Sequence, residues 1–149
     1  MGETLKKIID YLNKNNLDKA YELCDENSDK KIEHIVSNIK GVISFKRQKL
    51  ENAKSEFLKS IEINKNFIDP YKNLFKLNLQ IGNFNSAIEN GKKIIELDVQ
   101  KNSTSYFNLA LAYDLNKDYQ KAIEIYKIVE TLNFKEKKIL INNLAKCFW

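Results

Sequence analysis

The two cysteines and the histidine are the residues best suited to metal binding or nucleophilic chemistry. Cys24 and Cys147 lie far apart in the sequence, and His34 is the only histidine. Structural zinc sites use several soft ligands at short spacings, commonly as CxxC pairs, and this chain has no such pair. We therefore expect packed thiols in a reducing compartment, with no metal ion, no disulfide framework and no cofactor.

Motifs for catalysis are also missing from the sequence. The four glycines are isolated from one another and form no loop that could cradle a phosphate. A single histidine rules out most His-based relays, and no serine or cysteine lies in a context resembling a nucleophile elbow. The carboxylates are mostly interspersed with lysines, which is typical of solvated helix faces. We expect a protein that is not an enzyme.

The composition favours helices. Of the 149 residues 43% are hydrophobic and 30% are charged, with 4 glycines and 1 proline. The net charge is +5, but Arg47 is the only arginine, and RNA binding would favour arginine interleaved with exposed aromatic residues. No stretch approaches the roughly 18 apolar residues of a membrane span, and the N-terminal residues lack the apolar run of a signal peptide. We expect a soluble cytoplasmic protein with neither a nucleic-acid nor a membrane partner.

An internal repeat is the strongest signal in the sequence. Four alanines recur at separations of 33, 34 and 35 residues, and a bulky apolar residue stands three positions before each of them. A small residue lets two antiparallel helices cross closely, and the bulky neighbour covers the contact. The alanines are Ala20, Ala53, Ala87 and Ala122, and the bulky residues are Leu17, Leu50, Phe84 and Tyr119.

Other positions of the repeat predict where its helices begin and end. The position five residues before each alanine suits a tight turn, but only Asn15 and Gly82 are strong turn formers, beside Gln48 and Lys117. One residue later, Asn16, Asn83 and Asp118 can cap the second helix, whereas Lys49 has no capping explanation. Asp69 before Pro70 predicts a helix start there.

Two further positions of the repeat carry residues that vary in size. Those twelve residues before the alanines are Ile8, Gly41, Phe75 and Ala110, and those four residues after them are Cys24, Phe57, Gly91 and Tyr126.

These offsets resemble the tetratricopeptide-repeat family. The resemblance is clearest at residues 74–88, and at residues 108–113 followed by 117–123. It is weaker at residues 40–41 followed by 50–53, and it extends over essentially the whole chain. The resemblance implies an all-α solenoid of helix-turn-helix units that form a right-handed superhelix, with four repeats and a C-terminal helix.

We therefore expect a single array with units at about residues 1–33, 34–67, 68–102 and 103–137. Residues 138–149 echo the first helix of a unit, since Asn143-Leu144-Ala145 repeats Asn108-Leu109-Ala110 after 35 residues. Two interpretations stay open. The segment is either a capping helix that shields the fourth unit or the start of a fifth unit in a longer protein.

In the family, the first helices of successive pairs line a concave groove that usually binds a partner. The resemblance therefore implies that this chain is a protein-interaction scaffold that holds a peptide or partner segment in such a groove. Its candidate groove residues are Asn38, Lys72, Asn73, Lys76, Phe107, Asn108, Leu111 and Asn143.

Two chemistries are open at these residues. Asn73, Asn108 and Asn143 recur every 35 residues, with Asn38 a further 35 back, and such a ladder could grip the amides of an extended peptide. The alternative is that these asparagines only help the first helices to pack. Lys72 and Lys76 could pair with a peptide carboxylate, but Lys76 stands where the carboxylate-clamp members of the family have Asn.

Two further functions remain as alternatives. One is a targeting or substrate-presenting module of a larger enzyme, such as a transferase, truncated at Trp149. The other is self-association through the apolar C-terminal helix, where Ile141, Leu144 and Phe148 recur at helical spacing.

Overall fold

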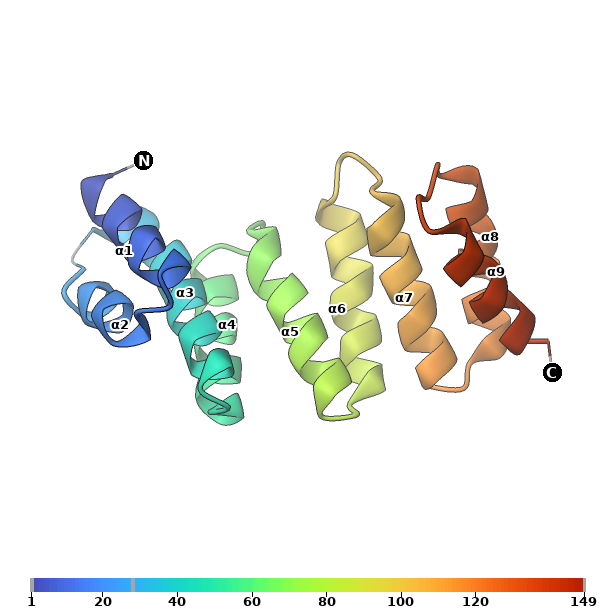
Figure 1. Cartoon of the computed structure of the whole chain (residues 1–149), viewed down its shortest axis with the longest axis horizontal. Coiled ribbons are helices and arrows are strands. Elements are labelled where there is room, and N and C mark those ends of the chain that lie inside the picture. The colour runs from blue at the N-terminus through green and yellow to red at the C-terminus, as the bar shows by residue number, and fades with distance from the viewer. Residues whose placement is uncertain (1, 28, 149) are drawn as a thin grey trace. The chain divides into compact units, whose positions relative to one another are not determined.

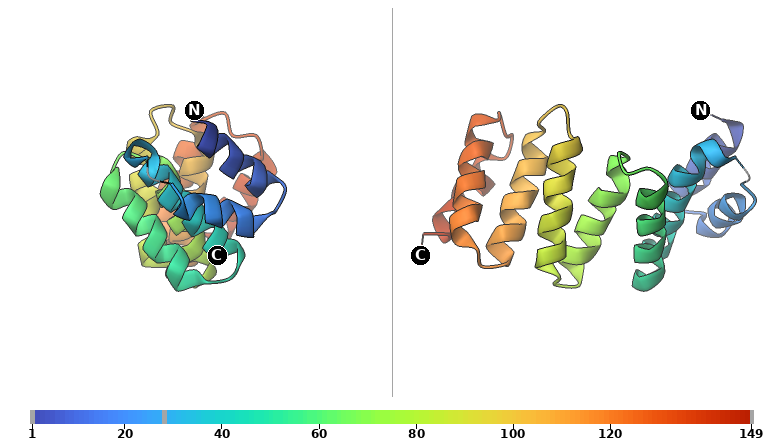
Figure 2. Two further views of the ribbon diagram at one scale, coloured as in Figure 1. Left: turned by 90° about the vertical axis from the view of Figure 1, so that its left-hand side faces the viewer. Right: turned by 180° about the vertical axis from the view of Figure 1, so that it is seen from behind.

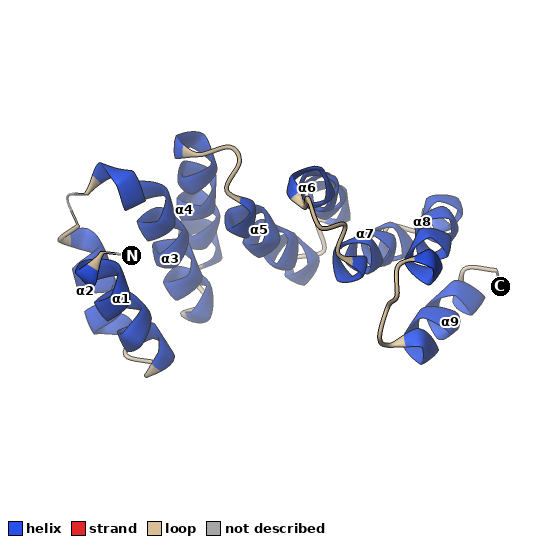
Figure 3. Ribbon diagram, turned by 90° about the horizontal axis from the view of Figure 1, so that it is seen from above, coloured by secondary structure: helices blue, strands red, loops and turns tan. Residues whose placement is uncertain are grey.

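The structure is a computed structural model that describes residues 2–27 and 29–148. Within these ranges all regular structure is helical (Figure 3), which confirms the expected all-α class. None of the described helices is long and apolar enough to cross a bilayer. The α-helices are α1 (Glu3–Asn13), α2 (Leu17–Asp25), α3 (Glu33–Lys46), α4 (Leu50–Ile63), α5 (Ile68–Gln80), α6 (Phe84–Leu97), α7 (Ser103–Leu115), α8 (Tyr119–Thr131) and α9 (Lys137–Lys146), with a short 3-10 turn at Lys30–Ile32.

The chain forms two compact units, Met1–Asn73 and Leu74–Trp149, whose boundary falls within α5. In unit 1, α1 packs against α2, α2 against α3, and α3 against α4 (Figure 1). In unit 2, α6 packs against α7, α7 against α8, and α8 against α9, and Figure 2 shows the same neighbours from behind. Consecutive helices from α1 to α4 and from α6 to α9 are therefore neighbours, as the helix-turn-helix pattern predicts.

The same turn joins the two helices of every pair. Three residues separate the two helices, and the middle one has a positive φ: 54° at Asn15, 59° at Gln48, 74° at Gly82 and 64° at Lys117. The backbone N–H of the following residue donates to a carbonyl five residues earlier, for example from Asn16 to Tyr11 at 2.8 Å. This pattern is the left-handed closure of a helix C-terminus. The predicted turn position is confirmed in all four repeats, including the two that lack a strong turn former.

The capping predictions are also confirmed at the next residue. The side-chain oxygens of Asn16, Asn83 and Asp118 each accept a hydrogen bond from a backbone N–H in the first turn of α2, α6 and α8. Lys49 makes no such bond at the start of α4. The start of α5 was predicted less well, because the helix begins at Ile68 and so includes Asp69. Pro70 is tolerated there since the first turn of a helix needs no intrahelical N–H donor.

The anchor alanines lie at the centre of each pair. Ala20, Ala53, Ala87 and Ala122 are all completely buried. A second contact joins the two repeat positions whose residues vary in size, twelve residues before each anchor alanine and four residues after it. In α3 and α4 the small Gly41 faces the large Phe57, because a Cβ atom placed on Gly41 would lie only 2.5 Å from two carbons of the Phe57 ring.

The third pair reverses this arrangement. There the first helix carries the large Phe75 and the second carries Gly91, whose added Cβ would lie 3.3 Å from the Phe75 ring. The fourth pair returns to a small residue on the first helix, with Ala110 and Tyr126 both completely buried. In the second and third pairs one large side chain therefore faces one glycine, and either helix can supply the large one; the fourth pair has the same combination of a small and a large residue. We call this arrangement the large–small contact.

The closeness of the Gly41 contact predicts that Gly41→Ala destabilises the protein. Alanine is favoured over glycine in a helix by about 1 kcal/mol, but overpacking against Phe57 should cost about 1–3 kcal/mol, so we expect a net loss of up to about 2 kcal/mol in the free energy of unfolding. Gly91→Ala meets a looser contact, 3.0 Å from a methyl group of Leu109, and should stay within about 1 kcal/mol of the parent. Urea unfolding of both variants measures the difference, and an increase in stability for Gly41→Ala would contradict the geometry.

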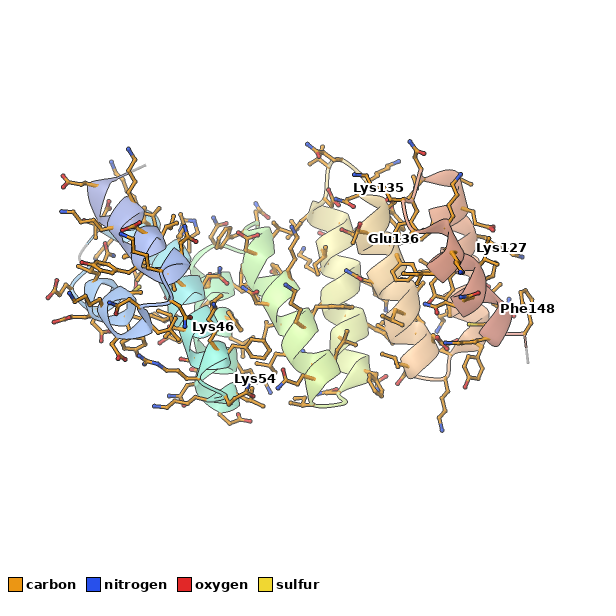
Figure 4. All side chains as sticks on the ribbon, viewed as in Figure 1. Lys46, Lys54, Lys127, Lys135, Glu136 and Phe148 are labelled. Carbon is orange, nitrogen blue, oxygen red and sulfur yellow. The ribbon has the colours of Figure 1, made fainter. Side chains whose placement is uncertain are left out.

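The positive φ at Lys117 predicts that Lys117→Gly stabilises the protein, by about 0.5–1 kcal/mol. Lys127→Gly is the matched control, because Lys127 is an exposed lysine inside α8 (Figure 4), where glycine should cost about 1 kcal/mol. Thermal unfolding followed by circular dichroism should move the two midpoints in opposite directions. Equal shifts for both variants would mean that the turn at Lys117 is unstrained.

Candidate protein-binding surface

Two members of the predicted asparagine ladder meet in unit 1. The side-chain amide of Asn73 on α5 donates to Oδ1 of Asn38 on α3 at 2.9 Å. The spacing of 35 residues therefore brings equivalent positions of two first helices into contact. Asn38 is only 7% exposed, whereas Asn73 is half-buried.

This hydrogen bond limits what each amide can offer to a partner. Asn38 is enclosed, and its amide oxygen is satisfied by the protein itself. An asparagine side chain has two N–H donors and an oxygen with two lone pairs, so the bond to Asn38 uses only part of the capacity of Asn73. Asn73 is thus the better placed of the two for contact with a partner, and Asn38 positions it.

The two lysines of the predicted groove lie on α5, one helical turn apart, and both are exposed. Lys72 belongs to unit 1 and Lys76 to unit 2. Exposed ammonium groups can attract a carboxylate, but as point charges they do not fix its orientation as arginine does. Their chemistry is therefore suited to an acidic segment without defining its geometry.

The remaining predicted residues lie in unit 2 and divide into packing and exposed groups. The Phe107 ring stacks on Phe134 with ring centres 4.7 Å apart and tilts against Tyr126 at 5.6 Å, so Phe107 contributes largely to packing. Asn108 and Leu111 on α7 are half-buried and retain some exposed surface.

Asn143 fastens α9 to α8. Its side-chain amide donates to the hydroxyl oxygen of Tyr126 at 3.4 Å, and Tyr126 itself is completely buried. Burial raises the pKa of the Tyr126 hydroxyl to about 12, and the hydrogen bond from Asn143 opposes this rise. The hydroxyl therefore stays protonated at neutral pH. Asn143, like Asn38, has a packing role in addition to any contact with a partner.

The structure also contains a cluster of charges between α2 and α3 that sequence reasoning missed. Lys40 pairs with Asp25, and Arg47 pairs with Asp18. Both cations also lie over the ring of Tyr21, at 5.5 and 5.6 Å from its centre. These partners are 15 to 29 residues apart and belong to no motif, so only the folded geometry reveals them. The cluster joins the first pair to the second.

Cys24 lies beneath this cluster, and the sequence prediction of a packed thiol holds there. The residue is buried in the core of unit 1 among Leu5, Ile8 and Ala20. Burial raises the pKa of the Cys24 thiol to about 11, although nearby Lys40 opposes the shift. A thiol with such a pKa is a poor nucleophile at neutral pH. The described residues also contain no cluster of three His, Cys, Asp or Glu side chains that could hold a metal ion.

A polar cleft of about 590 Å³ lies in unit 2, between the second helices α6 and α8 and the end of α7. Lys92 and Lys121 line it. Lys92 pairs with Glu89 on the same helix at 2.8 Å, and Lys121 pairs with Asp118, the residue that caps α8, at 2.9 Å. Because these charges are compensated locally, the cleft has no net attraction for an anion. The first helices remain the better candidate surface.

Comparison with known sequences identifies the fourth repeat. The profile of the family described as tetratricopeptide repeat matches residues 103–135, close to the predicted unit at 103–137. The chain is also similar to the Sol locus transcriptional repressor of Clostridium acetobutylicum, with 29% identity over 143 residues. This match covers 96% of the chain and 43% of the repressor, so the chain spans less than half the length of that relative.

Solved structures share the fold at low sequence identity. MamA of AMB-1 is 19% identical, with a TM-score of 0.79 over 96% of this chain and 78% of that chain. The tetratricopeptide-repeat domain of Arabidopsis OM64 is 18% identical, with a TM-score of 0.67 over 80% and 97% of the two chains. A tetratricopeptide repeat protein from Parabacteroides merdae is 16% identical, with a TM-score of 0.83 over 97% and 59%. The resemblance to the tetratricopeptide-repeat family is thereby confirmed: the chain carries a matched repeat at residues 103–135 and has the helix-pair fold of that family.

Proposed function

We propose that this chain is a protein-interaction scaffold that binds a segment of a partner protein along the first helices of unit 2, at Lys76 on α5 and Asn108 on α7. The observation that carries the proposal is the exposure of polar and charged side chains on these helices, away from the large–small contacts. Lys72 and Lys76 are exposed on α5, and Asn73 and Asn108 are partly exposed on α5 and α7. Structural relatives in the tetratricopeptide-repeat family support a protein partner in general terms.

The chemistry of these residues favours an extended, acidic segment. Asparagine amides can donate to and accept from the backbone of a peptide that has no internal hydrogen bonds. Lysines next to them attract carboxylates and raise the association rate without demanding one geometry. Asn38 accepts a hydrogen bond from Asn73 in unit 1, and Asn143 donates one to Tyr126 in unit 2.

The likeness to part of a transcriptional repressor favours a second candidate. This second candidate function is also that of a scaffold with the same binding mode, but its partner belongs to the machinery of gene regulation. The alternative of a transferase module draws no support from this relative, whose name is that of a regulator. The identity of a captured partner separates the two candidates.

Photocrosslinking from the first helices tests the proposal. A benzoyl-phenylalanine residue placed at Lys76 or at Asn108 should crosslink to a partner protein in cells that express the chain. The same group placed at the exposed Asn85 on α6 or Lys127 on α8 should not do so, because those residues belong to second helices and lie outside the proposed surface. Mass spectrometry of the adducts identifies the partner.

Calorimetry with that partner then measures each contribution. We expect Lys76→Ala with Asn108→Ala to weaken binding about tenfold or more, as loss of central contacts typically does. The matched control, Asn85→Ala with Lys127→Ala, should leave binding unchanged. Equal affinities for the two double variants, or crosslinks from the second helices alone, would refute the proposed surface.

A further inference from the structure

Asp114 carries a negative charge at an unfavourable place on a first helix of unit 2. It lies in the last turn of α7, which ends at Leu115 and has no basic residue in that turn. The free carbonyl groups of a helix C-terminus already carry about half a negative charge, so an acid there is disfavoured and a lysine is preferred. The last turn of α9 follows this preference with Lys146. The C-terminal end of α7 is therefore a negative pole.

The contacts of Asp114 within the fold leave this charge uncompensated. Lys117 in the following turn and Lys146 on α9 are exposed, and the ion pairs between described residues include neither of these lysines and do not include Asp114. The Asp114 carboxylate instead accepts a hydrogen bond from the Cys147 thiol. Burial raises the pKa of this thiol, and the charge of Asp114 and the hydrogen bond raise it further. The neighbour of the carboxylate is thus a neutral group.

Asp114 is also within reach of a segment bound on the first helices. It is half-buried, so it retains some exposed surface, and it lies six residues after Asn108 on α7. A helix rise of about 1.5 Å per residue separates the two by about 9 Å along the axis. An extended chain covers that distance in about three residues. A segment that contacts Asn108 can therefore contact Asp114 as well.

Lys76 presents the opposite charge on the same surface of unit 2. It is exposed on α5 and, like Asp114, takes part in none of the ion pairs between described residues. We infer that the bound segment is dipolar, with a carboxylate that lies at Lys76 and a lysine or arginine that lies at Asp114. The segment then binds in one direction, since its reversal would place like charges together. This inference rests on the proposed function and sharpens it, because the acidic part of the segment is confined to the α5 side.

The position of Asp114 allows a first test in the free protein. Asp114→Asn removes an acid from a helix C-terminus, and we expect the midpoint of thermal unfolding to rise. Glu124→Gln is the matched control, because it makes the same change of charge at an exposed residue inside α8 and should leave the midpoint nearly unchanged. A midpoint lowered by Asp114→Asn would mean that Asp114 serves the stability of the fold, and it would overturn the inference.

Two synthetic peptides test the direction of binding. They share one composition, with three glutamates and three lysines on opposite sides of a serine–glycine spacer, and differ in which end carries the glutamates. Fluorescence anisotropy with the full chain at low salt should show that one peptide binds at least tenfold more tightly than the other. Asp114→Asn should weaken the tighter complex about fivefold, whereas Glu124→Gln should not change it.

Exchanging the two charges of the protein gives the sharpest result. Lys76→Glu with Asp114→Lys should reverse which of the two peptides binds more tightly. No binding of either peptide, equal affinities for the parent chain, or an order of affinities that the exchange leaves unchanged would overturn the inference. The proposed function would still stand if Lys76→Ala with Asn108→Ala weakened binding of the crosslinked partner, so the two failures are distinguishable.

Discussion

The contact between one large and one small side chain determines how closely the helices of a pair can approach. Antiparallel helices packed by ridges into grooves need a small residue wherever their backbones come nearest. Phe57 lies over Gly41, and Phe75 lies over Gly91 from the opposite helix. The total volume at the contact matters more than which helix carries the aromatic ring, as expected for interiors that are packed as densely as crystals. The anchor alanines show no such exchange, since all four repeats carry alanine on the second helix and all four alanines are completely buried.

The turns, caps and polar contacts of the fold depend on this close helix packing and orient the helices within it. The left-handed turn at Asn15, Gln48, Gly82 and Lys117 reverses the chain in the same way four times, and three side-chain caps then start the next helix. Surface ion pairs such as Lys92 with Glu89 contribute little, since both groups remain hydrated. The asparagine contact between α3 and α5 fixes the register of successive first helices. Packing therefore sets the spacing, and polar groups set the register.

Much of this fold was predictable from the sequence because its determinants recur at constant offsets. The anchor alanines, the turn residue and the caps can each be recognised because a suitable residue type recurs at one offset of the repeat. The large–small contact cannot, because residue size varies at both of its offsets, and the two sizes match only when the helices are paired in space. The sequence predicts Asn38 and Asn73 as groove residues, and only the structure shows that their side chains form a hydrogen bond with each other. Phe134, in the loop before α9, stacks on Phe107 and lies outside any repeated offset, so no sequence signal indicated it.

The large–small contact sets the spacing of helices within a pair, since Phe57 faces Gly41 and Phe75 faces Gly91 from the opposite helix. Exchanging the two partners of one contact tests this most directly. In Gly41→Phe with Phe57→Gly, the second pair would adopt the arrangement of Phe75 and Gly91. We predict that the free energy of unfolding of this double variant, measured in urea, lies within about 2 kcal/mol of the parent, while each single variant loses about 3–5 kcal/mol or fails to fold. A double variant as unstable as the sum of the two single variants would contradict the account.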